Sequence, residues 1–261
     1  MKLICIDKIL NDGESITSLG MSKILDQLNP PSCSESEIPV LYELKKIFCS
    51  DNPAPQEFQT ASDQVRSAIR DREPFLVISS TEISNILVLP TFFELYPTGG
   101  LLELSSGIHL VSSNIFLKDS QGSKNPRPLP ILLAGTRIRS LEEASIIRSN
   151  GIRSYPMKLI IEEGIQETTH AIMESCRAYP ALFIIINLNV LDPAFAPGLL
   201  NPAPGGLSTR ELTHLVQKLL ILPTVRGIQI TGYNPNIAMG QETVNITCAL
   251  AREIIGSLPH P

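Results

Sequence analysis

Residues 182–211 constrain the fold more than any other stretch of the chain. The stretch begins with the apolar run Leu182–Ile186, which is rich in β-branched side chains and is typical of a central parallel strand covered on both faces. A loop rich in proline and glycine follows, and Ser208 and Glu211 then form the Ser-x-x-Glu pattern that begins a helix. This order of strand, polar loop and helix predicts a ligand site at the carboxyl end of the strand, as in open α/β sheets.

Apolar runs alternate with helical patterns along the rest of the chain. We expect strands at residues 3–7, 75–78, 100–104, 131–134, 152–157 and 226–231, and helices at residues 20–28, 56–70, 86–96, 140–150, 162–176, 208–220 and 240–258. The helix at residues 86–96 is expected to break at Pro90, and residues 40–48 fit either a helix or a strand. The alternation predicts an α/β fold: a single three-layer α-β-α domain over residues 1–261 with a mainly parallel sheet.

Composition and charge argue against several classes of function. The net charge is -5 and no basic patch is visible, which argues against a nucleic-acid partner. No apolar run approaches the ~20 residues that a membrane-spanning helix needs, and the stretch MKLICIDKIL has no cleavage site of small residues. The 5 cysteines are scattered and odd in number, which favours free thiols over disulfides or zinc. We therefore expect a cytoplasmic protein with no membrane partner.

Two amides, Asn187 and Asn189, stand directly after the apolar run. Residues two apart on a strand point to the same face, so both side chains are expected together at the carboxyl end of the strand. They could bind a carboxylate or an amine of a substrate, or they could be satisfied structural amides. Arg137, which follows Gly135 after another predicted strand, could pair with an anion or a neighbouring subunit, or form a structural salt bridge. Serines end two further predicted strands: Ser79, Ser80, Ser105 and Ser106.

The stretch LDPAFAPGLLNPAPGGLSTRE resembles the most recognisable motif of the ureohydrolases, the family of arginase, agmatinase and formimidoylglutamase. The positions that frame the loop in that motif fall on Asp192, Pro193, Pro197, Gly198, Gly205 and Gly206. PFLVISSTEIS, GLLELSSGIHL and TGYNPN resemble three further strand ends of the family, whereas residues 1–55 are the most divergent part. The resemblance implies an arginase/deacetylase-like fold and a homo-oligomer, a trimer or a hexamer.

The resemblance also implies where the chemistry of the family would lie. Its members hold two Mn²⁺ ions and hydrolyse linear amidine C–N bonds with a bridging hydroxide. The six metal-ligand positions fall on Glu82, Ser105, Gly107, His109, Asn187 and Asn189, and none of them keeps the residue of the family. The glutamate that meets the substrate guanidinium falls on Gly232.

These replacements predict that the binuclear site is lost. Two divalent ions a few Å apart repel each other by several kcal/mol at an effective dielectric constant of ~20, and Glu82 is the one carboxylate left to offset them. Manganese prefers anionic oxygen ligands, amides are weak substitutes, and Gly107 offers no side chain. We therefore expect no cofactor and a non-catalytic role, as a pseudoenzyme with a regulatory, scaffolding or subunit function. Its assembly would be a homo-oligomer or a hetero-oligomer with an active paralogue.

Three alternatives stay open at the level of sequence. The same cleft could serve a metal-free binding module for an amino acid, an amine or a guanidino compound. The chain could instead be an active arginase- or agmatinase-like hydrolase with an atypical site. Glu82 and His109 could also hold a single metal ion together with a third ligand.

Overall fold

The computed structural model describes residues 1–8, 18–28, 34, 42–49, 55–70, 73–80, 83–108, 130–137, 140–234 and 240–258. The strands are β1 (Lys2–Lys8), β2 (Glu43–Cys49), β3 (Phe75–Ser79), β4 (Gly100–Leu104), β5 (Ile131–Ala134), β6 (Arg153–Tyr155), β7 (Leu182–Asn187) and β8 (Val225–Thr231). The helices are α1 (Ser18–Leu28), α2 (Pro55–Ile69), α3 (Ile83–Leu95), α6 (Leu141–Ser149), α7 (Met157–Glu163), α8 (Ile165–Cys176), α9 (Thr209–Leu220) and α10 (Gly240–Ser257), with the short 3₁₀ helix η1 (Leu188–Val190) after β7.

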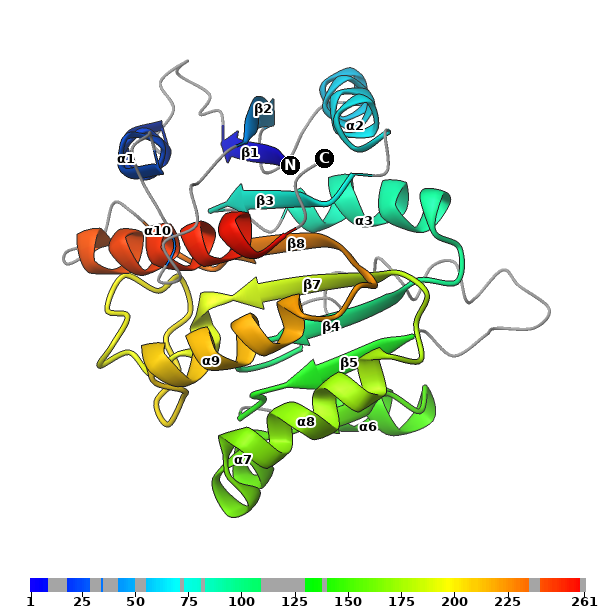
Figure 1. The fold of residues 1–261 in the computed structure, drawn as a ribbon, viewed down its shortest axis with the longest axis vertical. Coiled ribbons are helices and arrows are strands. Elements are labelled where there is room, and N and C mark those ends of the chain that lie inside the picture. The colour runs from blue at the N-terminus through cyan, green and yellow to red at the C-terminus, as the bar shows by residue number, and fades with distance from the viewer. Residues whose placement is uncertain are drawn as a thin grey trace.

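The described strands form one 8-stranded sheet in the order β2-β1-β3-β8-β7-β4-β5-β6 (Figure 1). Every pairing in this sheet is parallel. The apolar run that opens residues 182–211 is β7, and it lies between β8 and β4 with all of its residues buried. The α/β class and the parallel sheet predicted from the sequence are confirmed.

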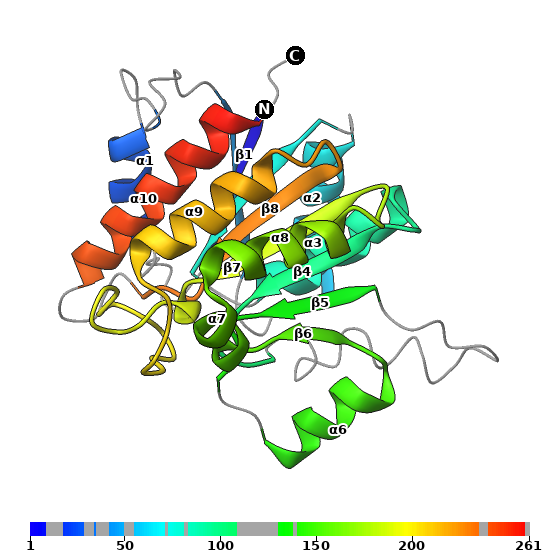
Figure 2. The same ribbon diagram turned by 60° about the horizontal axis from the view of Figure 1, so that its bottom comes forward.

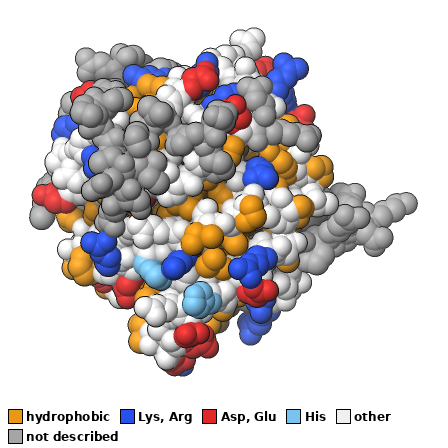
Figure 3. All heavy atoms as spheres, viewed as in Figure 1, with side chains coloured by type: hydrophobic (Ala, Val, Ile, Leu, Met, Phe, Trp, Pro, Cys, Tyr) orange, Lys and Arg blue, Asp and Glu red, His pale blue; other side chains and the backbone are white. Residues whose placement is uncertain are grey.

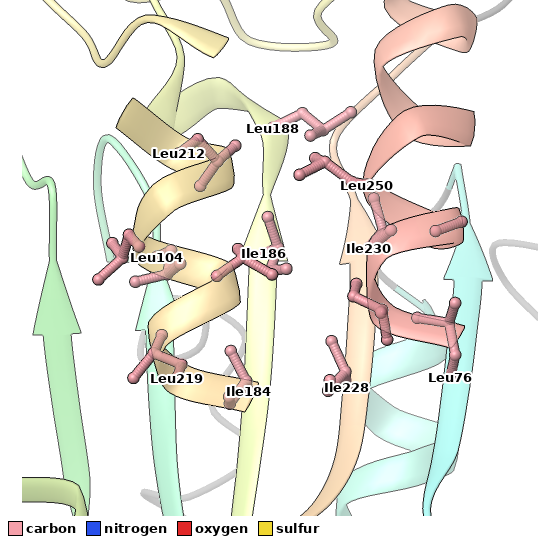
Figure 4. Close-up of a cluster of buried hydrophobic side chains, with 14 of the residues drawn as sticks. Leu76, Leu104, Ile184, Ile186, Leu188, Leu212, Leu219, Ile228, Ile230 and Leu250 are labelled. Carbon is pink, nitrogen blue, oxygen red and sulfur yellow. The ribbon is translucent and has the colours of Figure 1, made fainter. Parts of the chain in front are cut away.

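Helices cover both faces of the sheet (Figures 1 and 2). On one face, α1, α8, α9 and α10 pack on strand residues such as Ile184, Ile186 and Ile228, as Figure 4 shows for α9 and α10. On the other face, α2, α3 and α6 pack on residues such as Phe183 and Ile185. Because successive side chains of a strand alternate, β7 supplies both cores, which is why its sequence is apolar throughout.

The expected break at Pro90 is wrong, because α3 runs from Ile83 to Leu95 with Pro90 inside it. The proline ring lies on the exposed side of the helix, whereas its neighbours Leu89 and Phe92 are fully buried. Proline removes one intrahelical hydrogen bond and bends a helix, but the burial of an apolar face can outweigh that local cost.

Two other expectations are corrected or settled. The single helix expected at residues 162–176 is wrong, because the chain forms α7 and α8 with Gly164 between them at φ +85°. Glycine adopts such a positive φ at little cost, and it ends the first helix here. Residues 40–48, for which helix and strand were both open, contain most of the edge strand β2.

The outer surface gives two further observations. None of the helices within the described ranges combines the length and the apolar composition that a membrane span needs. On the side of the molecule drawn in Figure 3, acidic and basic side chains are interspersed, with apolar side chains between them.

Candidate functional site

The carboxyl ends of β3, β8, β7 and β4 lie next to one another in the sheet, and the sequence-predicted positions follow them. Leu104 pairs with Ile186, so Ser105 follows β4 beside the end of β7. Asn187 pairs with Thr231, and Gly232 is the next residue after β8. Four of the six former ligand positions therefore lie along one edge of the sheet: Ser105, Gly107, Asn187 and Asn189. Glu82 and His109 are outside the described residues.

Asn187 is the last residue of β7 and is buried. Its Oδ1 accepts a hydrogen bond from the backbone N–H of Asn189 at 3.2 Å, which caps the 3₁₀ helix η1. Asn189 therefore lies inside η1 and not on the strand, so the expected strand alternation of the two amides is wrong. A short polar side chain that bonds to the backbone two residues ahead favours a turn over a continued strand.

Asn189 joins the end of β7 to the end of β4. Its Oδ1 accepts from the Ser105 hydroxyl at 3.1 Å and from the Ser106 backbone N–H at 3.0 Å. The Ser105 hydroxyl oxygen in turn accepts from the Gly107 N–H at 3.4 Å. We call these five residues, Ser105, Ser106, Gly107, Asn187 and Asn189, the strand-end network. Within it, the amide oxygens are directed at protein donors.

Gly232 is adapted to the position of Asn187. Its φ is +88°, a backbone angle that residues with a side chain rarely adopt. A Cβ built at this position would collide with Oδ1 of Asn187 and would lie 3.1 Å from the Leu188 nitrogen. A side chain at Gly232 is therefore incompatible with the observed conformation of Asn187.

We expect Gly232→Ala to lower the free energy of unfolding by about 2–4 kcal/mol, because backbone strain and the collision add together. Urea denaturation measures this loss. Gly164→Ala is the matched control, since Gly164 has a similar φ of +85° with nothing within 4 Å of a built Cβ. Equal losses of unfolding free energy in the two variants would show that backbone strain alone causes the loss and that no collision with Asn187 contributes.

Arg137 holds the loop that follows β7, residues 188–207. Its Nη1 donates to the carbonyl oxygen of Val190 at 2.9 Å, and its Nη2 donates to those of Asn189 and Ala203, both at 2.7 Å. Burial lowers the pKa of this guanidinium and the Asp192 carboxylate raises it, and arginine remains charged in proteins. Of the three roles left open for Arg137, the contacts shown are structural, but the partners are backbone carbonyls and not the carboxylate of the expected salt bridge.

Asp192 closes the same loop from the other side. Its Oδ1 accepts from the Ala194 N–H at 2.9 Å, as expected of a turn-capping aspartate before Pro193. Its Oδ2 accepts from the N–H groups of Gly205 at 2.6 Å and Gly206 at 3.3 Å, longer-range contacts that no local pattern in the sequence predicts. A Cβ on Gly206 would lie 2.5 Å from the Asp192 nitrogen, so only glycine fits there.

The remaining frame positions anchor the loop to α10. The Gly198 N–H donates to the Thr243 hydroxyl at 2.7 Å, and a Cβ on Gly198 would lie 2.7 Å from Cα of Gly240. Pro197 precedes this close contact in a turn and stiffens the approach to it. The loop therefore keeps its shape through contacts between protein groups.

The loop should weaken in acid. Hydrogen bonds from the backbone of Ala194, Gly205 and Gly206 and the charge of Arg137 lower the pKa of Asp192. A lowered pKa in the folded state stabilises the protein above the unfolded-state value of about 3.9, and this stabilisation is lost as the pH falls through the folded-state pKa. We expect Asp192→Asn to flatten the fall of Tm between about pH 5 and pH 2. Asp26→Asn, at an exposed position of α1, is the control and should keep the wild-type profile.

The described donor set does not fit a pair of divalent cations. Ser105, Asn187 and Asn189 are neutral, Gly107 has no side chain, and the two amide oxygens already accept protein hydrogen bonds. Among the residues that the structure describes, no three His, Cys, Asp or Glu side chains gather as a metal site. Hard divalent cations prefer anionic oxygens, which these four positions lack.

Residues 121–256 match the family model described as "Arginase family". Arginase from Bacillus caldovelox is 28% identical over 136 residues, which are 50% of this chain and 44% of the relative. Proclavaminate amidinohydrolase from Streptomyces clavuligerus is 35% identical over 107 residues, which are 41% of this chain and 32% of the relative. The matched stretches thus span between about a third and a half of the length of these relatives.

Solved structures extend the likeness of fold to nearly the whole chain. Arginase from Bacillus subtilis superposes with a TM-score of 0.78 at 18% identity and covers 98% of this chain and 99% of its own. The proclavaminate amidinohydrolase of Streptomyces clavuligerus superposes with a TM-score of 0.76 at 18% identity and covers 98% of this chain and 91% of its own. At these identities the superpositions establish the fold and not the reaction.

Proposed function

The chain belongs to the arginase family, and on that premise we propose that it is a member without the binuclear manganese site, acting as a non-catalytic regulatory, scaffolding or subunit component. The observation that supports this most directly is the strand-end network. Asn189 and Ser105, at two former ligand positions, bond to each other at 3.1 Å, as neutral groups do and as two carboxylates would not.

The position of the substrate glutamate supports the same proposal. Gly232 offers no carboxylate to a guanidinium, and the Asn187 side chain lies where a Cβ would stand. Metal binding and substrate binding are therefore both weakened at the same strand ends. Without a metal-bound water of lowered pKa, the hydrolytic nucleophile is missing as well.

The Arg137 and Asp192 contacts explain how such a protein would keep its fold. They hold residues 188–207 through hydrogen bonds that involve no metal ion. A loop held by protein groups alone is consistent with a protein that acts through its surface and its assembly. We propose assembly with further copies of itself or with an active paralogue, in the cytoplasm.

Metal content and hydrolysis together test the proposal. The full chain is incubated with excess MnCl₂, passed through a desalting column, and analysed for manganese by mass spectrometry and for urea release from L-arginine and agmatine. We expect manganese far below one ion per chain and no urea above the enzyme-free blank. Two bound ions per chain together with urea release would overturn the proposal, and an active arginase treated in parallel checks that the assay works.

A further inference from the structure

The strand β2 forms one edge of the sheet among the described strands (Figure 1). The backbone N–H of Glu43 donates to the Met1 carbonyl at 3.0 Å, so the backbone groups of Glu43 face β1. Alternate residues of a strand direct their backbone groups to opposite edges, so those of Leu44 and Lys46 face away from the sheet. An outward row of backbone groups is a template for pairing with another strand.

The side chains at this edge are exposed. Leu44 is 37% exposed and is one of the large apolar side chains that the fold leaves uncovered. Glu43 and Lys45 lie on the other face of the strand, where their side chains are 58% and 50% exposed and form an ion pair at 2.9 Å. An apolar residue at the open edge therefore lies between two residues of opposite charge.

This order of residues is complementary to itself in an antiparallel pairing. A two-fold axis at Leu44 places this residue opposite Leu44 of a second copy, where the outward backbone groups of the two residues exchange two hydrogen bonds. Glu43 then lies opposite Lys45 of the second copy, and Lys45 lies opposite Glu43 of the second copy. Opposite charges at such cross-strand positions stabilise a pair of strands.

The neighbouring register, with the axis at Lys45, is unfavourable. It places two lysines directly opposite each other and Leu44 opposite Lys46, and like charges at such positions destabilise the pairing. With the axis at Leu44, Lys46 lies opposite Tyr42, which is partly buried against the core, and a lysine beside an aromatic ring is a favourable contact. Edge lysines usually oppose pairing between copies, but in this register each lysine meets a favourable neighbour.

We propose that β2 binds β2 of a second copy of this chain, antiparallel and centred on Leu44, so that one sheet continues through both copies. The inference rests on the assembly part of the proposed function and assigns that assembly to one edge of the sheet. Because both copies use the same surface, the contact closes as a dimer.

A disulfide tests the contact and its register. Residues directly opposite each other in a hydrogen-bonded antiparallel pair have Cα atoms about 5.5 Å apart, which a disulfide can span. We expect the full chain with Leu44→Cys, mildly oxidised, to give a covalent dimer on a non-reducing gel. The wild-type chain, with its 5 native cysteines, should not give this dimer.

Two further cysteine variants are the controls for this cross-link. Ile221→Cys, at a side chain 67% exposed at the end of α9, measures random collisions between chains. Lys45→Cys would cross-link in the neighbouring register, whereas the proposed register holds the two Lys45 positions too far apart. Equal yields from Leu44→Cys and Ile221→Cys, or a covalent dimer from Lys45→Cys alone, would overturn the inference.

Charge exchange tests the ion pairs in solution, with the dissociation constant of the dimer measured by sedimentation equilibrium. Lys45→Glu places glutamates opposite each other, so we expect the dissociation constant to rise about tenfold or more. Adding Glu43→Lys restores both pairs and should return it to within about threefold of wild type. Lys158→Glu, at an exposed position of α7, makes the same change of net charge and should leave it unchanged.

Two results in solution would contradict the proposed contact. One is a wild-type chain that stays monomeric up to about 200 µM, and the other is a dimer that Lys45→Glu does not weaken. Oligomers that form without the Leu44→Cys cross-link would place the assembly on another surface and overturn only this inference. Two bound manganese ions per chain with urea release would instead overturn the proposed function.

Discussion

Replacing Ser105 and Asn189 together with aspartate should lower the free energy of unfolding by about 3–5 kcal/mol at pH 7. The Ser105 hydroxyl and the Asn189 amide oxygen are 3.1 Å apart, and two unit charges at that distance repel by about 5 kcal/mol at an effective dielectric constant of 20. The pair would keep one proton, so the pKa of one carboxyl rises in the folded state. A raised carboxyl pKa destabilises the fold as the pH climbs above about 3.9, so the variant should approach wild-type stability near pH 4.

Manganese completes this experiment. We expect Mn²⁺ at about 1 mM to raise the Tm of the double aspartate variant, because a divalent cation offsets the two negative charges. The same concentration should leave the wild-type Tm unchanged. Urea denaturation and thermal unfolding with and without Mn²⁺ measure both effects. Ser105→Asn is the control for side-chain size without charge, and it should show neither the pH dependence nor the response to metal. A wild-type Tm that rises with Mn²⁺ would contradict the proposed function.

Arg137→Met should cost about 3–5 kcal/mol of stability, because the carbonyl oxygens of Asn189, Val190 and Ala203 lose a charged donor while remaining buried. Methionine keeps much of the aliphatic stem, so the loss of the donor dominates over the loss of packing. Hydrogen exchange should show the Gly205 and Gly206 amides exchanging faster, since their acceptor Asp192 belongs to the same loop.

Arg148→Met is the matched control for this change. Arg148 lies exposed on α6, and its Nε donates to the Ala144 carbonyl within the same helix at 3.2 Å. We expect an effect within about 0.5 kcal/mol, as is usual for surface positions. Equal effects of the two substitutions would show that Arg137 does not hold residues 188–207.

Those features of the fold that depend on local sequence patterns could be predicted from the sequence. The apolar run of β7 predicts a central strand, and the Ser208–Glu211 pattern predicts the start of α9, where Ser208 Oγ accepts from the Glu211 N–H at 3.2 Å. The helix break expected at Pro90 is wrong because the packing of α3 on the sheet outweighs the local effect of proline on a helix. One helix was expected across Gly164 because the helical spacing of apolar residues continues there. The helical backbone is nevertheless interrupted at this glycine.

The site depends on contacts that no local pattern contains. Asn189 and Ser105 are separated by 84 residues, and Arg137 reaches the Ala203 carbonyl across 66. The former ligand positions came from resemblance to a family, and the orientation of the Asn187 and Asn189 amides came from the structure alone. The roles of Glu82 and His109 stay predictions, since both lie outside the described residues.

The position of β8 has a consequence for synthesis of the chain on the ribosome. Among the strands that the structure describes, β2, β1 and β3 form one block, β7, β4, β5 and β6 form another, and β8 alone joins them. Within the described part of the chain β8 (Val225–Thr231) is the last strand in sequence order, so the edges of β3 and β7 stay unpaired until it has been synthesised. Unpaired edges of this kind are templates for pairing between nascent chains, so a premature stop just before β8 would leave an aggregation-prone product.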